Sequence, residues 1–73
     1  MKEIELHEGE MHLSRRVTVH AADGATVVHV LCCVAVKAGG RLSIRPYIKE
    51  TPFTIYHDRE LHVLADGRLM EEC

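Results

Sequence analysis

The feature that most constrains this chain is a run of alternating apolar residues between positions 17 and 48. These side chains fall on one face of an extended chain, and the pattern resumes after a Gly-Gly turn: Val17, Val19, Ala21, Val28, Val30, Cys32, Val34, Val36, Leu42, Ile44 and Ile48. A period of two is typical of β-strands that bury one face. The pattern therefore predicts an all-β protein.

The length and composition limit the class of protein. The chain has 73 residues, of which 47% are hydrophobic and 27% charged, as in soluble globular proteins. We expect a single all-β domain over residues 1-73. The apolar stretch 25–38 contains His29 and Lys37 and is shorter than the roughly 18 residues of a membrane helix. The first residues lack the features of a signal peptide, and an odd number of cysteines is a poor disulfide framework, so we expect a cytoplasmic protein.

Glycine-containing dipeptides mark the expected turns. Three of them lie between alternating segments: Glu8-Gly9, Asp23-Gly24 and Asp66-Gly67. Glycine suits tight hairpins because their central residues need positive φ. A two-residue turn at the first dipeptide would pair residues 4–7 with residues 10–13, with Leu6 opposite Met11. The sequence therefore predicts an antiparallel meander of about six to seven short strands.

The middle hairpin has a defined register. A three-residue loop over residues 38–40 pairs Val34 with Ile44 and keeps polar residues off the apolar face. Pro46 predicts the end of a strand or a position at a sheet edge. We expect this proline and an acidic first strand to protect the edges of the sheet.

The C-terminal third is expected to continue the meander. Residues 53–56 predict a strand, and a turn near residues 57–59 precedes a last hairpin around Asp66-Gly67. A helix over residues 58–72 is the alternative, which Gly67 disfavours. Because no amphipathic helix is predicted to cover the apolar face, we expect a small barrel or a sandwich, with homodimerisation as the next solution.

The charges are arranged in blocks. Residues 1–13 hold one Lys and four Glu, a net charge of −3; residues 14–49 hold six Lys or Arg and one Asp, a net charge of +5; residues 50–73 hold two Arg and six Asp or Glu, a net charge of −4. The acidic ends either pair with the basic middle or form a docking surface for a basic partner. The residues of that acidic surface are Glu3, Glu5, Glu8, Glu10, Glu60, Asp66, Glu71 and Glu72.

A basic sheet face is the alternative binding surface. Its residues are Arg16, His20, His29, Lys37, Arg41, Arg45 and Tyr47. Such a face would suit single-stranded nucleic acid. The net charge of −2, the pI near 6.3 and the few aromatic residues disfavour that use.

The six histidines raise the question of a metal site. We expect His20 and His29 on one face of the hairpin at Asp23-Gly24, with Cys33 on that face as well. However, no metal-binding spacing occurs, and Cys33 stands about two strand steps of roughly 6 to 7 Å from His29, so no metal or cofactor is expected.

Other histidines are interpreted as cross-strand partners of glutamates. The expected pairs are Glu5 with His12 and His62 with Glu71. Protonation would strengthen such pairs, which predicts no loss of stability between about pH 7.5 and 6.

No catalytic residues are expected. Cys33 with His29 lacks the signature of a nucleophile and its base, and Gly39-Gly40 is a hairpin turn rather than a phosphate loop. The expected function is therefore a non-enzymatic protein-binding module. Short, motif-free proteins of this sort are typical of phage and mobile-element inhibitors, anti-CRISPR proteins among them, which block a host protein or nucleoprotein complex through a charged surface. The alternatives are a nucleic-acid-binding β domain and a homo-oligomeric structural or metal-binding domain.

Overall fold

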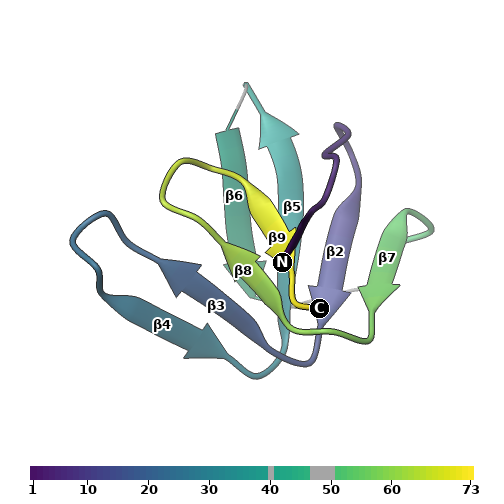
Figure 1. Cartoon of the computed structure of the whole chain (residues 1–73). Coiled ribbons are helices and arrows are strands. Elements are labelled where there is room, and N and C mark those ends of the chain that lie inside the picture. The colour runs from purple at the N-terminus through teal and green to yellow at the C-terminus, as the bar shows by residue number, and fades with distance from the viewer. Residues whose placement is uncertain (40, 47–50) are drawn as a thin grey trace.

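The computed structural model describes residues 1–39, 41–46 and 51–73, which form nine strands and no helix (Figure 1). The strands are β1 (Lys2–Glu3), β2 (Met11–Ser14), β3 (Val17–His20), β4 (Thr26–His29), β5 (Cys32–Ala38), β6 (Arg41–Pro46), β7 (Thr54–His57), β8 (Leu61–Val63) and β9 (Leu69–Glu71). They form a five-stranded sheet with the order β1-β9-β8-β3-β4 and a four-stranded sheet with the order β6-β5-β2-β7. The prediction of an all-β protein is confirmed. None of the described residues lies in a helix of the length and hydropathy that crossing a membrane requires.

Two segments far apart in the sequence run side by side in the same direction. β2 pairs in parallel with β7, with Ser14 opposite His57, and β3 pairs in parallel with β8, with Val17 opposite Leu61. Both segments pass from the four-stranded to the five-stranded sheet. At this passage between the sheets, the Leu61 N–H donates to the Arg16 carbonyl at 3.0 Å. The expected turn near residues 57–59 is therefore a crossing between sheets. The predictions of an antiparallel meander and of a closed barrel are wrong, because both sheets are mixed and keep their edges.

The turn at Glu8-Gly9 forms without the predicted hairpin. Gly9 has a φ of 86°, and the Glu10 N–H donates to the His7 carbonyl at 3.3 Å. The flanking strands then separate, because β1 pairs with β9 whereas β2 pairs with β5 and β7. Ile4 and Leu6 pack against the core instead of opposite β2. Burial of these two side chains thus outweighs the local pairing.

The hairpin at Asp23-Gly24 forms in a different register. The Ala21 N–H donates to the Ala25 carbonyl at 2.9 Å, so the loop contains three residues rather than two. As a result, Val19 lies opposite Val27, and Val28 is on the other face. One residue of slip exchanges the two faces of the following strand.

The other hairpins agree better with prediction. Val34 lies opposite Ile44, as expected, with an irregularity between Ala35 and Ala38; Gly40 of the predicted loop lies outside the described residues. Pro46 ends β6, which is an edge strand. β8 and β9 form the last hairpin, so the alternative helix over residues 58–72 is wrong.

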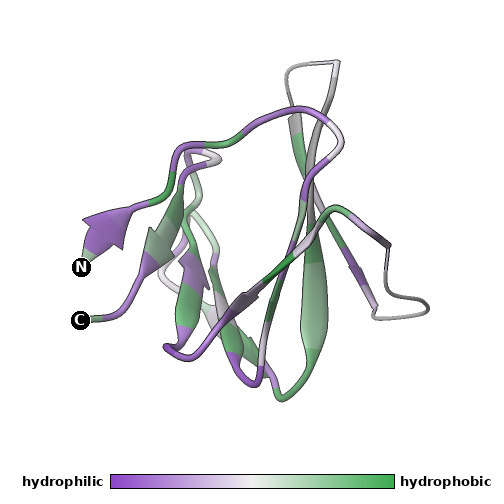
Figure 2. Cartoon of the chain, turned by 90° about the vertical axis from the view of Figure 1, so that its right-hand side faces the viewer, coloured by the Kyte–Doolittle hydropathy of each residue, from purple (hydrophilic) through white to green (hydrophobic). Residues whose placement is uncertain are grey.

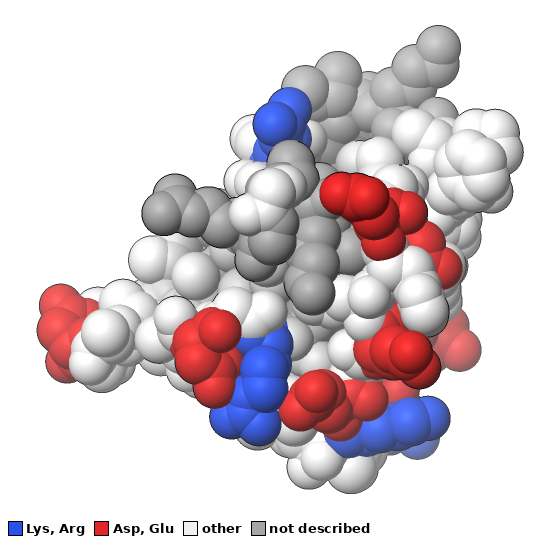
Figure 3. Space-filling view, turned by 90° about the horizontal axis from the view of Figure 1, so that it is seen from above, with Lys and Arg blue, Asp and Glu red and all other residues white. Residues whose placement is uncertain are grey.

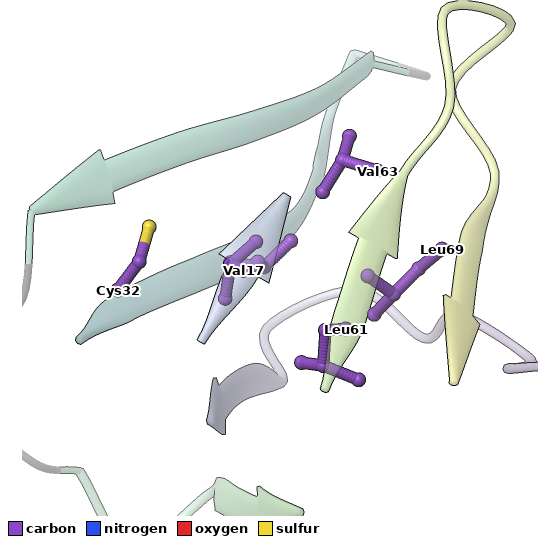
Figure 4. Packing of buried hydrophobic residues seen from close by; sticks show 6 residues of the cluster. Val17, Cys32, Leu61, Val63 and Leu69 are labelled. Carbon is purple, nitrogen blue, oxygen red and sulfur yellow. The ribbon is translucent and has the colours of Figure 1, made fainter. Parts of the chain in front are cut away.

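The core lies between the two sheets (Figures 2 and 4). Its buried members are Val17, Cys32, Val34, Leu61, Val63 and Leu69. Cys33 is also fully buried, although alternation places it on the opposite face from Cys32. The face opposite the predicted apolar one is therefore covered at Cys33 as well.

Candidate interaction surface

β4 is an exposed apolar edge strand. All four of its residues are exposed, and it packs chiefly against β3. The exposed fraction is 55% for Val27, 47% for Val28, 78% for Val30 and 51% for Leu31. An edge strand presents unpaired backbone N–H and C=O groups in addition to its side chains. We define Thr26–Leu31 as the β4 edge.

The register of the β3–β4 hairpin explains why both faces of β4 are exposed. Val27 faces the same side as Val19, which packs against the core, but Val27 itself lies beyond the core cluster. Figure 1 shows the β3–β4 hairpin at one side of the molecule. Val28 faces the outer side of the sheet with Thr18. Val27 and Val28 are adjacent in β4, so the strand exposes a valine on each of its two sides.

A groove begins at the end of the β4 edge. Leu31 lines it together with Leu13 and Tyr56, and its volume is about 450 Å³. Arg15 and Asp58 supply one charge of each sign to the same groove. The exposed apolar surface thus continues from β4 onto the outer side of the four-stranded sheet.

Most residues of the predicted acidic surface have partners within the chain. Arg68 donates to Asp66 at 2.8 Å and to Glu3 at 3.5 Å, and it holds the pKa of the Asp66 carboxyl below its usual range through hydrogen bonds. Glu5 lies 3.7 Å from His7. Acidic and basic side chains adjoin on the face shown in Figure 3. The charged partners in these contacts, Arg68 and His7, belong to the acidic end blocks themselves, so the contacts do not join the acidic ends to the basic middle.

The structure divides the predicted basic face between the two sheets. His20 and His29 belong to the β3–β4 hairpin and face opposite sides of it, because His20 pairs with Thr26 whereas His29 pairs with Val17. Arg45 belongs to β6 in the other sheet, and Arg16 lies between β2 and β3. The Lys37 and Arg41 side chains and the whole of Tyr47 lie outside the described residues.

A first chain of histidines links the sheets. His12 Nδ1 and His57 Nε2 are 2.9 Å apart, and His57 Nδ1 donates to the Glu71 carboxylate at 2.8 Å. The two rings stack with centroids 5.2 Å apart. His12 is only 1% exposed, and its Nε2 has no hydrogen-bond partner among the described residues, although Glu10 Oε1 is 3.8 Å away.

Burial disfavours protonation of His12, the first member of this chain of histidines. It lowers the pKa of His12, and the neighbouring His57 lowers it further, whereas Glu10 acts in the opposite direction. The expected pairing of Glu5 with His12 is absent, because the first hairpin does not form. A histidine that resists protonation reverses the expected dependence of stability on pH.

A second chain of histidines lies on the outer side of the five-stranded sheet. His20 Nε2 and His62 Nδ1 are 2.9 Å apart, and His62 Nε2 donates to the Glu72 carboxylate at 3.0 Å. The Thr18 hydroxyl donates to Glu60 Oε1 at 2.9 Å. The hydrogen bond from His62, followed by one with Glu60, holds the pKa of Glu72 below its usual range. Glu72 therefore takes the place that the sequence assigns to Glu71.

Sequence reasoning missed both histidine chains. The paired histidines are 45 and 42 residues apart, and they meet only because β2 and β3 lie in parallel with β7 and β8. The predicted grouping of His20, His29 and Cys33 does not form, because two of them face opposite ways and the third is buried. Comparison with known proteins finds no matching family, no similar curated protein and no similar solved structure.

Proposed function

We propose that this protein is a non-enzymatic protein-binding module that pairs with a second copy of itself along the β4 edge. The observation that supports this proposal is the exposure of the whole edge strand together with the valines on both of its faces. Unpaired strand edges bind other strands through backbone hydrogen bonds, and the alternate side chains determine which strand fits.

The charge of the segment favours a second copy as the occupant. Residues 25–31 contain no Asp, Glu, Lys or Arg, so two copies meet without repulsion between like charges. An antiparallel pair centred on Val28 would place Thr26 opposite the partner's Val30 on one face. The other face would place Val27 opposite the partner's His29. Both sets combine β-branched or ring side chains that pack well across strands.

The other edges are less suited to this pairing. β1 has two residues, both charged, and β6 ends at Pro46, which has no N–H to donate. β7 keeps Thr54 and His57 partly buried, and His57 already binds Glu71. Because the acidic side chains pair within the chain, the geometry gives less support to a charged inhibitor surface than to the β4 edge.

The first test is the oligomeric state. Light scattering coupled to size exclusion is expected to give twice the chain mass of 8.2 kDa at high micromolar concentration. The V28K variant should be monomeric, because it places two ammonium groups side by side at the centre of the pair. F53K is the matched control, since Phe53 is also an exposed apolar residue but lies outside the β4 edge. A monomeric wild type, or a V28K dimer, would overturn the proposal.

Crosslinking tests the register. In a C73S background, oxidation of V28C should give a covalent dimer, because side chains directly opposite each other have Cβ atoms about 4.5–5.5 Å apart. T26C is the control, because two copies of that residue would lie about 13 Å apart in the same register. A T26C dimer without a V28C dimer would contradict the two-fold pairing about Val28.

A further inference from the structure

Three potential metal ligands converge on the outer side of the five-stranded sheet. Glu60, His62 and Glu72 each offer one ligand atom, and these atoms all lie within 4.8 Å of one another. Leu61 points into the core, so alternation directs its two neighbours to the outer side. The Glu72 N–H donates to the Glu60 carbonyl at 2.9 Å, which fixes the segment after β9 beside the start of β8. The backbone thus brings the three ligands together.

His62 is oriented as a metal ligand is. Its Nε2 faces Glu72, and its Nδ1 is 2.9 Å from His20 Nε2. Histidines that bind a metal through one nitrogen usually donate the other N–H to a neighbouring acceptor, which fixes the tautomer and the ring plane. His20 provides that acceptor when its own ring proton is on Nδ1, a tautomer that is compatible with the 2.9 Å contact. Its stacked ring, with centroids 5.1 Å apart, limits rotation of the His62 ring.

Glu60 has a supporting partner as well. The Thr18 hydroxyl donates to its Oε1 at 2.9 Å, and Thr18 itself is buried. This bond holds the Glu60 carboxylate in place beside His62 and Glu72. Both Glu60 and His62 therefore have the outer partners that typically orient ligands of a metal site.

The charges also favour a cation. Glu60 and Glu72 bring two carboxyl groups within hydrogen-bond distance of each other, with Arg16 as the nearby positive charge. A divalent ion would replace the proton that such a pair shares. At the centre of the cluster, it would also replace the proton that His62 Nε2 donates to Glu72. One imidazole and two carboxylates suit Zn²⁺, which binds nitrogen and oxygen at about 2.0–2.2 Å and leaves a fourth position for water. Ligand atoms around such an ion lie about 3.4 Å apart, a contraction that rotation of the two glutamates can supply.

We propose that Glu60, His62 and Glu72 bind one divalent transition-metal ion, with Zn²⁺ as the best fit, and that His20 is the residue that positions His62. The site belongs to β3, β8 and β9 of one copy, so it does not depend on pairing along β4.

Calorimetric titration of the untagged, chelator-treated C73S protein with ZnCl₂ tests the proposal. We expect one Zn²⁺ per chain, loss of measurable binding in H62Q, and a 10- to 100-fold weaker affinity in H20Q. H29Q is the matched control, because His29 is exposed and lies on the other side of the hairpin. Absence of binding in the C73S protein, or binding that H62Q leaves unchanged, would overturn the proposal.

A second measurement avoids the substitutions in the cluster. In histidine-ring ¹H–¹⁵N spectra of the C73S protein, Zn²⁺ should shift the Nε2 signal of His62 and place the ring proton on Nδ1, toward His20. Saturable shifts confined to other histidines, such as His7 or His29, would show binding elsewhere and would contradict the proposal.

Discussion

Glu71 and Glu72 are adjacent in the sequence, yet they accept hydrogen bonds from histidines on opposite sides of the five-stranded sheet. Glu71 lies opposite Leu61 on the core side and binds His57, whereas Glu72 binds His62 on the outer side. One dipeptide at the end of β9 therefore terminates both histidine chains. The inner histidine chain, His12–His57–Glu71, joins the two sheets. The outer histidine chain, His20–His62–Glu72, provides two of the three proposed metal ligands.

The burial of His12 in the inner histidine chain leads us to expect that the protein loses stability in acid. Because the pKa of His12 is lowered from 6.5, the unfolded chain binds more protons than the folded chain just below that pH. Stability should be full above pH 6.5 and should fall, by at most about 1.4 kcal/mol per pH unit from this residue, as the pH decreases toward the lowered pKa. Urea unfolding between pH 7.5 and 5.5 measures the slope. The slope of H12Q should be smaller than that of the wild type, and equal slopes would contradict the assignment to His12.

The contact between Glu71 and His57 is expected to stabilise the fold. Both side chains are mostly buried, so E71Q should lower the free energy of unfolding by about 1.5–3 kcal/mol, as for other hydrogen bonds to charged groups. E5Q is the control, because Glu5 and His7 are exposed and 3.7 Å apart. Urea unfolding at pH 7 compares the two variants, and equal effects would show that the inner chain contributes no special stability.

A core residue should tolerate truncation poorly. Leu69 is fully buried among residues of both sheets, so L69A should lower the free energy of unfolding by about 2–5 kcal/mol. In a domain of this size, such a loss is expected to leave a large unfolded fraction at 25 °C. L31A should have little effect, because Leu31 is half exposed. Circular dichroism during thermal unfolding distinguishes the two outcomes.

The last hairpin depends on the backbone of its glycine. Gly67 has a φ of +89° with nothing within 4 Å of an added Cβ, so G67A costs conformational energy without a steric clash. We expect a loss of about 1–2 kcal/mol for G67A and a smaller loss for G67N, since asparagine tolerates positive φ better. Urea unfolding of both variants tests this order, and a more stable G67A would contradict the described turn.

Local patterns predicted the strands of the middle of the chain and one of its registers. Alternation is a property of neighbouring residues, and the pairing of Val34 with Ile44 follows from it together with the glycines between them. The loop after Ala21 shows the limit of this reasoning. Its single additional residue places Val27 rather than Val28 opposite Val19.

The histidine chains were beyond prediction for a different reason. No short-range signal specifies that β2 lies in parallel with β7, and without that pairing His12 and His57 are unrelated histidines. Alternation predicted that Cys33 lies on the face opposite the apolar one, but it does not show that this face of β5 is covered as well at that point. Only tertiary packing determines these positions.

The parallel pairing of β2 with β7 and of β3 with β8 also affects how the protein folds. Neither sheet is complete until β7 and β8 have joined strands that lie some forty residues earlier. Closing such a loop costs entropy before any long-range contact forms, which favours slow and all-or-none folding. During synthesis, β1 to β6 therefore emerge before the strands that complete the sheets, which are β8 and β9 in one sheet and β7 in the other. The apolar β4 edge is exposed until those strands have been made.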